Sequence, residues 1–144
     1  METIVILCFC TAIAVIDIKT YRIPNLLLAC FALVMALIYR HDPFILLRLA
    51  SSAAALLIFG CVFITSGGMG LGDVKYAAVL GFVLSLDRLV PAFLIAALLA
   101  LLAYTAGRLL FRWNKTTRIP FAPFLSGGAM AAIAGGISLT GLAP

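Results

Sequence analysis

Six apolar runs, separated by short polar breaks, extend along almost the whole chain. They cover residues 3–16, 24–39, 44–64, 74–86, 89–110 and 120–139. None of the runs alternates apolar and polar residues in the way that a membrane β-barrel requires. Backbone N–H and C=O groups find no water inside a bilayer, so apolar runs of this kind form helices. The pattern predicts an all-α fold, a polytopic membrane bundle with about six transmembrane helices.

Composition supports a membrane protein over a soluble one. Hydrophobic residues make up 65% of the 144 residues and charged residues 10%. A soluble domain carries about 25% charged residues, because its surface must face water. This chain lacks the residues to cover such a surface, and its length leaves room for one bundle and little else. We therefore expect a single integral-membrane domain over residues 1–144, with the lipid bilayer as its solvent.

The net charge of +5 indicates how the chain is oriented in the membrane. No basic run is interleaved with aromatic residues on a polar face, so no nucleic-acid partner is expected. The breaks after the second and fourth runs hold Arg40 and Arg88. The breaks after the first, third and fifth runs hold the larger set, Lys19, Arg22, Lys75, Arg112, Lys115 and Arg118. Because basic loops stay in the cytoplasm, these odd-numbered breaks are predicted to be cytoplasmic and both termini to lie outside.

Two of the five acidic residues stand at the ends of separate apolar runs. Asp17 follows the first run, and Asp73 precedes the fourth. A carboxylate at bilayer depth costs about 2.5–3.5 kcal/mol, so such residues are usually functional. In the predicted topology both lie on the cytoplasmic side, and each precedes a lysine by two positions. Two carboxylates that share one proton can act together as base and acid, so the pattern points to an aspartyl pair.

Each acid also has a structural interpretation. Asp73 follows a glycine-rich segment, residues 66–72, and capping of the next helix would explain it as well. Asp17 would pair with Lys19 or Arg22 at the membrane interface. Two further functions remain open: a transporter or channel subunit in which the acids bind cations or relay protons, and an assembly protein with a glycine-rich helix contact.

Cysteine and histidine offer no other chemistry. Cys8, Cys10, Cys30 and Cys61 all lie within apolar runs, and the only histidine is His41. Metal ligation needs such residues at chelating spacing, so neither a metal nor another cofactor is expected. The cysteines are predicted to be buried as small apolar side chains. No serine, threonine or cysteine is paired with a histidine in the predicted cytoplasmic breaks, which argues against an acyl-enzyme mechanism.

Three segments together carry a resemblance to a known family. Residues 70–75, Gly-Leu-Gly-Asp-Val-Lys, resemble the GxGD motif of the type IV prepilin peptidases, a family of membrane aspartyl proteases. Residues 17–25, Asp-Ile-Lys-Thr-Tyr-Arg-Ile-Pro-Asn, resemble the segment with the family's other catalytic aspartate. Residues 120–125, Pro-Phe-Ala-Pro-Phe-Leu, resemble its Pro-Phe-Gly-Pro-Phe-Leu stretch, with Ala122 where glycine is usual. The resemblance runs from about Thr3 to about Ile137.

The resemblance implies an endopeptidase of the cytoplasmic (inner) membrane. Such enzymes cut the basic leader from prepilins or pseudopilins, just before a hydrophobic helix, at the cytoplasmic face. Asp17 and Asp73 would be the catalytic pair that activates water. Gly70 and Gly72 are expected to admit the substrate backbone, while Lys19 and Lys75 either contact the substrate or anchor the chain at the interface. Two-function members also methylate the new terminus through a domain with paired C-x-x-C motifs, which this sequence lacks. The chain itself is therefore expected to cleave without methylating, either as a peptidase alone or with a partner that supplies the methyltransferase.

Overall fold

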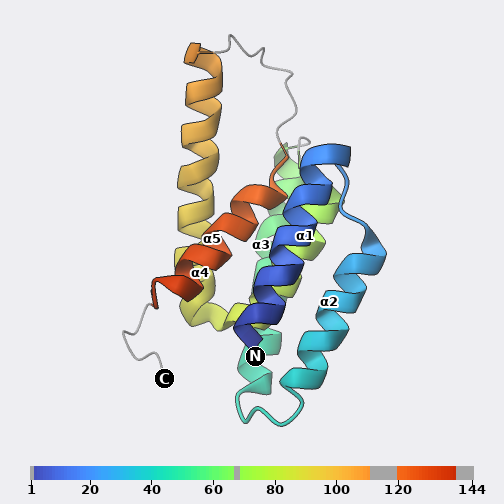
Figure 1. Cartoon of the computed structure of the whole chain (residues 1–144). Helices are drawn as coiled ribbons and strands as arrows, with labels where there is room; N and C mark the ends of the chain where they lie inside the picture. The colour runs from blue at the N-terminus through green and yellow to red at the C-terminus, as the bar shows by residue number, and fades with distance from the viewer. Residues whose placement is uncertain (1, 67–68, 111–119, 139–144) are drawn as a thin grey trace.

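The computed structural model describes residues 2–66, 69–110 and 120–138, which form five helices and no strand. Their bounds are α1 Glu2–Thr20, α2 Asn25–Ile38, α3 Ile45–Ser66, α4 Leu71–Leu110 and α5 Ala122–Ala134. Figure 1 shows them packed side by side as a bundle. The predicted all-α fold is confirmed.

The predicted count of six helices is not confirmed, because the fourth and fifth apolar runs belong to one element, α4. This element is broken at Ser85, where φ is 57° and ψ is 168°, outside the helical region. Both ends of α4 lie toward the top of Figure 1, and the chain between them lies lower. The two halves of α4 therefore run in opposite directions. The break was predicted at residues 87–88, which are helical.

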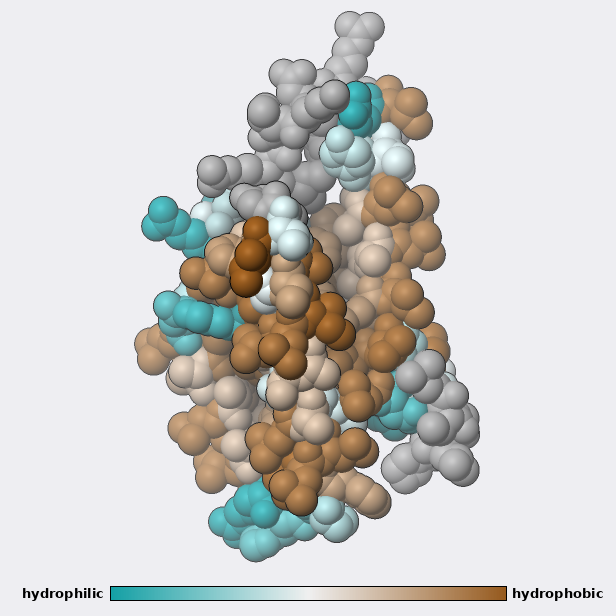
Figure 2. Space-filling model, turned by 180° about the vertical axis from the view of Figure 1, so that it is seen from behind, coloured by the Kyte–Doolittle hydropathy of each residue, from teal (hydrophilic) through white to brown (hydrophobic). Residues whose placement is uncertain are grey.

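Three of the described helices are long and apolar enough to cross a membrane, in the segments Glu2–Thr20, Ile45–Thr65 and Leu71–Leu109. Large hydrophobic side chains such as Leu26 and Ile64 are exposed on the outside of the bundle. Figure 2 shows hydrophobic residues over most of one face, with hydrophilic residues at its lower end, along its edges and near its top. A continuous apolar surface of this kind suits contact with lipid rather than water. The chain is thus a membrane protein.

Small residues let the helices approach closely. A Cβ added at Gly81 of α4 would lie 2.7 Å from the carbonyl oxygen of Ser51 in α3. A Cβ at Gly128 of α5 would lie 2.9 Å from the backbone nitrogen of Ala96 in the second half of α4. Lipid tails are as apolar as the helices, so close backbone packing of this kind is what holds a membrane bundle together.

An arginine organises the end of the bundle where α4 is broken. The break at Ser85 leaves carbonyls of the preceding turn without their intrahelical donors. Nη1 of Arg48 donates to the carbonyl oxygen of Val83 at 2.7 Å, and Nε pairs with Oδ2 of Asp42 at 2.7 Å. The guanidinium also stacks on the ring of Tyr39, 3.7 Å from its centroid. Arg48 thereby ties the α2–α3 loop to the break.

The prediction of four buried cysteines is wrong for three of them. Cys10 is buried, whereas Cys8, Cys30 and Cys61 are exposed on the described helices. In lipid a small apolar side chain is as well accommodated on the outside of a bundle as in its interior. Apolar character alone therefore does not determine which way a cysteine faces.

Candidate active site

The structure brings Asp17 and Asp73 to the same end of the bundle. Asp17 lies in the last turn of α1 and is only 5% exposed. Asp73 lies in the first turn of α4 and is half-buried. The two carboxyl groups are close enough for their charges to interact. Two carboxylates from different helices thus lie near each other, where α1 ends and α4 begins.

Asp17 is held by the start of α5. Its Oδ2 accepts a hydrogen bond from the backbone N–H of Ala122 at 3.2 Å, in a buried position. The first N–H groups of a helix have no intrahelical partner, and they carry the positive end of the helix dipole. Phe121, at the N-cap of α5, provides no side-chain cap. A carboxylate from α1 therefore takes the place of a local cap.

Sequence reasoning did not identify Ala122 as part of this site. A backbone N–H has no side-chain signature, so nothing at position 122 itself marks it. The available signal was the segment 120–125, whose Pro123 stands at the start of α5, a position that proline favours. A helix N-terminus at that point offers unpaired donors to a nearby carboxylate.

Asp73 lies in the first turn of α4, close to the backbone of Gly70. Its carboxyl group lies against the backbone N–H of Gly70, and its own N–H donates to the carbonyl oxygen of Gly70 at 3.1 Å. A side chain in the first turn that reaches back to the N-cap residue is one half of a capping box. Asp73 thus stands at the third position of α4, where a side chain can support the N-terminus, rather than at the N-cap itself, and its carboxyl group is half-buried.

The loop after α1 packs against the start of α4. Tyr21 ends α1 with a left-handed φ of 51°, and its N–H donates to the carbonyl oxygen of Asp17 at 2.8 Å. The chain then turns so that Ile23 meets Gly72, where an added Cβ would lie 3.2 Å from Cβ of Ile23. Nζ of Lys75 donates to Oδ1 of Asn25 at 3.0 Å. The segments 17–25 and 70–75 are therefore in direct contact.

The nearby basic residues do not pair with the aspartates. Lys75 bonds to Asn25, while Lys19 and Arg22 are exposed, and neither forms an ion pair with Asp17 in the described part of the chain. The interpretation of Asp17 as one half of an interfacial ion pair is therefore wrong. Three further predicted basic residues, Arg112, Lys115 and Arg118, lie outside the described residues.

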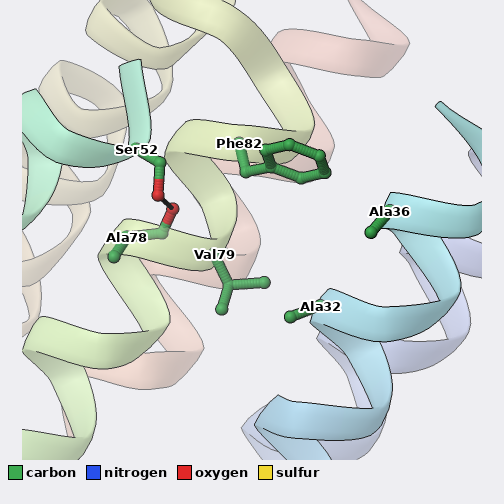
Figure 3. Close-up of a pocket in the computed structure, with 6 residues that line it drawn as sticks. All are labelled: Ala32, Ala36, Ser52, Ala78, Val79 and Phe82. Atoms are coloured by element: carbon green, nitrogen blue, oxygen red, sulfur yellow. Dashed lines mark hydrogen bonds between the residues drawn. The ribbon is translucent and has the colours of Figure 1, made fainter. Parts of the chain in front are cut away.

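A cavity of about 230 Å³ lies between α2, α3 and α4. Figure 3 shows Val79 and Phe82 of α4 pointing toward Ala32 and Ala36 of α2. The hydroxyl of Ser52 at its edge is already used, since it donates to the carbonyl oxygen of Ala78 at 2.8 Å. The full lining is Ala32, Ala36, Ser52, Ala78, Val79 and Phe82. Because this lining contains no titratable group, the cavity itself offers no acid–base chemistry.

Comparisons with known proteins agree with the segments described above. The model of the type IV leader peptidase family matches residues 4–105, a range that contains both aspartates. A curated relative, the prepilin leader peptidase/N-methyltransferase of Bacillus subtilis (strain 168), is 36% identical over 130 residues. The match covers 88% of this chain and 52% of that protein, so the chain spans about half the length of the relative. No solved structure matches the chain.

Proposed function

Because the chain belongs to the type IV leader peptidase family, we propose that it is a membrane aspartyl endopeptidase. Its substrates are type IV prepilin or pseudopilin precursors, from which it removes the basic leader. The observation that carries this proposal is the meeting of Asp17 and Asp73 at one end of the bundle, from two different helices. Both residues lie within the range that the family model matches.

The proposed mechanism uses water and one proton shared between the two carboxyl groups. The ionised carboxylate takes a proton from a water whose oxygen attacks the scissile carbonyl carbon, and the protonated carboxyl donates to the carbonyl oxygen. The resulting gem-diol then collapses. The C–N bond breaks, the leaving nitrogen takes the proton that came from water, and a gem-diol proton returns to the other carboxylate. No covalent enzyme intermediate forms, and the pair ends in its starting state.

The residues beside the pair differ in what they offer a substrate. Gly70 is exposed next to the carboxyl of Asp73, so an extended substrate backbone has room to approach there. Lys75 and Lys19 are exposed at the same end and are proposed to contact the substrate near its cleavage site. Gly72 is proposed to act indirectly, because its missing side chain makes room for Ile23 rather than for open solvent.

The proposed orientation places the aspartates at the cytoplasmic face of the inner membrane. The basic residues Lys19, Arg22 and Lys75 stand at this end, and the positive-inside rule favours a cytoplasmic location for them. The two oppositely directed halves of α4 then cross the membrane as separate spans, which gives six crossings and places both termini outside. The substrate's hydrophobic helix would lie in the same bilayer, with its leader in the cytoplasm.

A cleavage assay in a defined bilayer tests the proposal. The purified chain in lipid nanodiscs is incubated with a peptide that carries a basic leader and the first part of a hydrophobic helix. Mass spectrometry should find a single cut at the junction, dependent on both Asp17 and Asp73. An intact peptide, together with an Asp-dependent proton or cation flux into liposomes, would instead support a transporter or channel subunit.

A further inference from the structure

A buried chain of hydrogen bonds joins three helices beneath the two aspartates. The hydroxyl of Tyr76 in α4 lies 2.7 Å from Oγ of Ser126 in α5, and Oγ of Ser126 lies 3.1 Å from the carbonyl oxygen of Cys10 in α1. The side chains of Tyr76 and Ser126 are 0% and 2% exposed. A carbonyl only accepts, so the serine donates to Cys10 and the tyrosine must donate to the serine.

Each member of this chain stands on the same helix face as a residue of the candidate site. Tyr76 follows Asp73 by three positions, and Ser126 follows Ala122 by four. Residues three or four apart lie above one another on a helix. The carbonyl of Cys10 lies two turns before Asp17 on α1. Three helices supply the two carboxyl groups and the N–H of Ala122 that donates to Asp17. The hydrogen bonds connect these same three helices, one or two turns further into the bundle.

We propose that Tyr76 and Ser126 are positioning residues for the Asp17–Asp73 pair, an inference that rests on the proposed function. They set the register of α5 against α1 and α4, so that the N–H of Ala122 stays on Asp17 and Asp17 keeps facing Asp73.

Apolar packing alone would set this register poorly. α5 has only 13 residues, and its apolar side chains gain as much from lipid as from neighbouring helices. A hydrogen bond, by contrast, requires a donor–acceptor separation near 3 Å and a near-linear angle. A shift of α5 by one residue would break both bonds and strand buried hydroxyls. The hydrogen bonds that join Tyr76, Ser126 and Cys10 thus make any other register of α5 less stable.

Tyr76 acts through the aspartates rather than on the substrate. Its side chain is fully enclosed, so neither substrate nor attacking water reaches the hydroxyl. Cys10 contributes its backbone carbonyl, which no side-chain substitution removes. The informative changes are therefore Tyr76→Phe, which removes one oxygen and keeps the ring, and Ser126→Ala, which removes the bridging hydroxyl.

The test compares these variants and their double mutant with two matched controls in the peptide-cleavage assay. Tyr104→Phe removes a hydroxyl from the same helix that accepts from Arg108 one turn away. Ser51→Ala removes an equally buried hydroxyl that donates within its own helix, to Leu47. All measurements are made well below each variant's melting temperature, where the folded fraction is complete and a merely structural role leaves kcat unchanged.

We expect Tyr76→Phe and Ser126→Ala each to lower kcat by about ten- to hundredfold, because small displacements of catalytic groups have effects of that size. KM should stay within about twofold, since neither residue meets the substrate. The double mutant should lose no more than the worse single variant, as expected for residues that act through one hydrogen-bond chain. The two controls should keep wild-type kcat.

Two results would overturn the inference. One is a kcat for Tyr76→Phe and Ser126→Ala equal to that of the controls, and the other is a strictly additive double mutant. If Tyr76→Phe does not fold, Ser126→Ala decides by the same measures. Failure of the proposed function looks different, because the wild-type protein would then leave the peptide uncut. An active wild type that loses activity in Asp17→Asn establishes the function, and the positioning variants are judged against it.

Discussion

Oδ2 of Asp17 accepts the backbone N–H of Ala122 at 3.2 Å, across 105 positions of sequence. The contact gives one side chain two tasks. As an acceptor, the carboxyl of Asp17 satisfies the first turn of α5 and holds that helix against α1. As a titratable group close enough to Asp73 for their charges to interact, it is proposed to take part in proton transfer. A substitution that keeps the first property and removes the second separates the two tasks.

Replacing either aspartate by asparagine should abolish cleavage and leave the fold intact. The amide oxygen of Asp17→Asn still accepts the N–H of Ala122, but an amide does not exchange a proton under these conditions. We expect turnover to fall by several orders of magnitude in both Asp17→Asn and Asp73→Asn, as for other catalytic groups. Melting temperatures should stay near that of the wild type.

Asp42→Asn serves as the control, because this acid lies at the far end of the bundle with Arg48. It should cleave like the wild type. If Asp17→Asn or Asp73→Asn retained about a tenth of wild-type turnover, that residue would have no part in proton transfer.

Gly72 should be required for packing against Ile23 rather than for access of the substrate. An added Cβ would lie 3.2 Å from Cβ of Ile23, tighter than an ordinary contact. We expect Gly72→Ala to lower activity and Gly72→Val to lower it further, because the side chain would push the loop after α1 away from α4. Shortening the neighbour in the pair Gly72→Ala and Ile23→Ala should restore most of the loss.

Gly70→Ala provides the comparison for substrate access. Its Cβ would meet Oδ2 of Asp73 at an ordinary 3.4 Å, so a rise in KM there would come from the space proposed for the substrate backbone and not from helix packing. If Gly72 instead admitted the substrate backbone, Ile23→Ala would give no rescue, and KM would rise in Gly72→Ala with or without it. Cleavage kinetics of the wild type, Gly72→Ala, Ile23→Ala and their double mutant, with Gly70→Ala beside them, distinguish these results.

Much of the fold and the location of the pair were predictable from the sequence. Helices follow from apolar runs in a chain with few charges, since lipid leaves the backbone no other partner. Asp17 and Asp73 are the two acids that lie within the segments 17–25 and 70–75. The distribution of basic residues predicts that both lie on the same side of the membrane. The contact between residues 17–25 and 70–75 then follows from bringing two helix ends to the same face.

The remaining features were hidden for physical reasons. The non-helical φ of Ser85 has no compositional signal, whereas the charged pair at 87–88 is typical of a break between two helices. The group that donates to the carboxyl of Asp17 is a backbone N–H. Every residue but proline carries one, so the sequence does not mark it. Cys8 faces outward and Cys10 inward on α1, although both stand in the same uniformly apolar run. Without alternation of polar and apolar positions, periodicity does not separate the lipid face from the core.

Acid should weaken the end of the bundle held by Arg48. The backbone N–H of Phe44 and the guanidinium of Arg48 both donate to Asp42, and these bonds hold the pKa of Asp42 below its usual value. A carboxyl whose folded pKa is depressed adds stability above its unfolded pKa of about 3.9. That stability is lost as the pH falls through the lower folded pKa.

Melting temperatures of the wild type and Asp42→Asn in nanodiscs, taken from about pH 7 to about pH 3, measure this contribution. The wild type should be more stable at neutral pH, and the difference should shrink in the acid range because asparagine does not titrate. A constant difference across that range would mean that the ionised form of Asp42 is not what stabilises this end.

The end of the bundle with the aspartates should face the cytoplasm. Lys19, Arg22 and Lys75 stand there, and the segment 111–119, which joins α4 to α5, contains Arg112, Lys115 and Arg118. The far end carries Arg40, Arg48 and Arg88, so the excess of basic residues falls on the side of Asp17. Single cysteines test this in a background where Cys8, Cys10, Cys30 and Cys61 are replaced by alanine and cleavage is retained.

Thr20→Cys places the probe at the end of α1 beside Asp17, and His41→Cys places it in the exposed loop between α2 and α3. A membrane-impermeant maleimide should label His41→Cys in intact cells and Thr20→Cys only after permeabilisation. Labelling of Thr20→Cys in intact cells, with His41→Cys protected, would put both carboxyl groups outside. A leader that remains in the cytoplasm would then not reach them, and the proposed substrate would have to be abandoned together with the orientation.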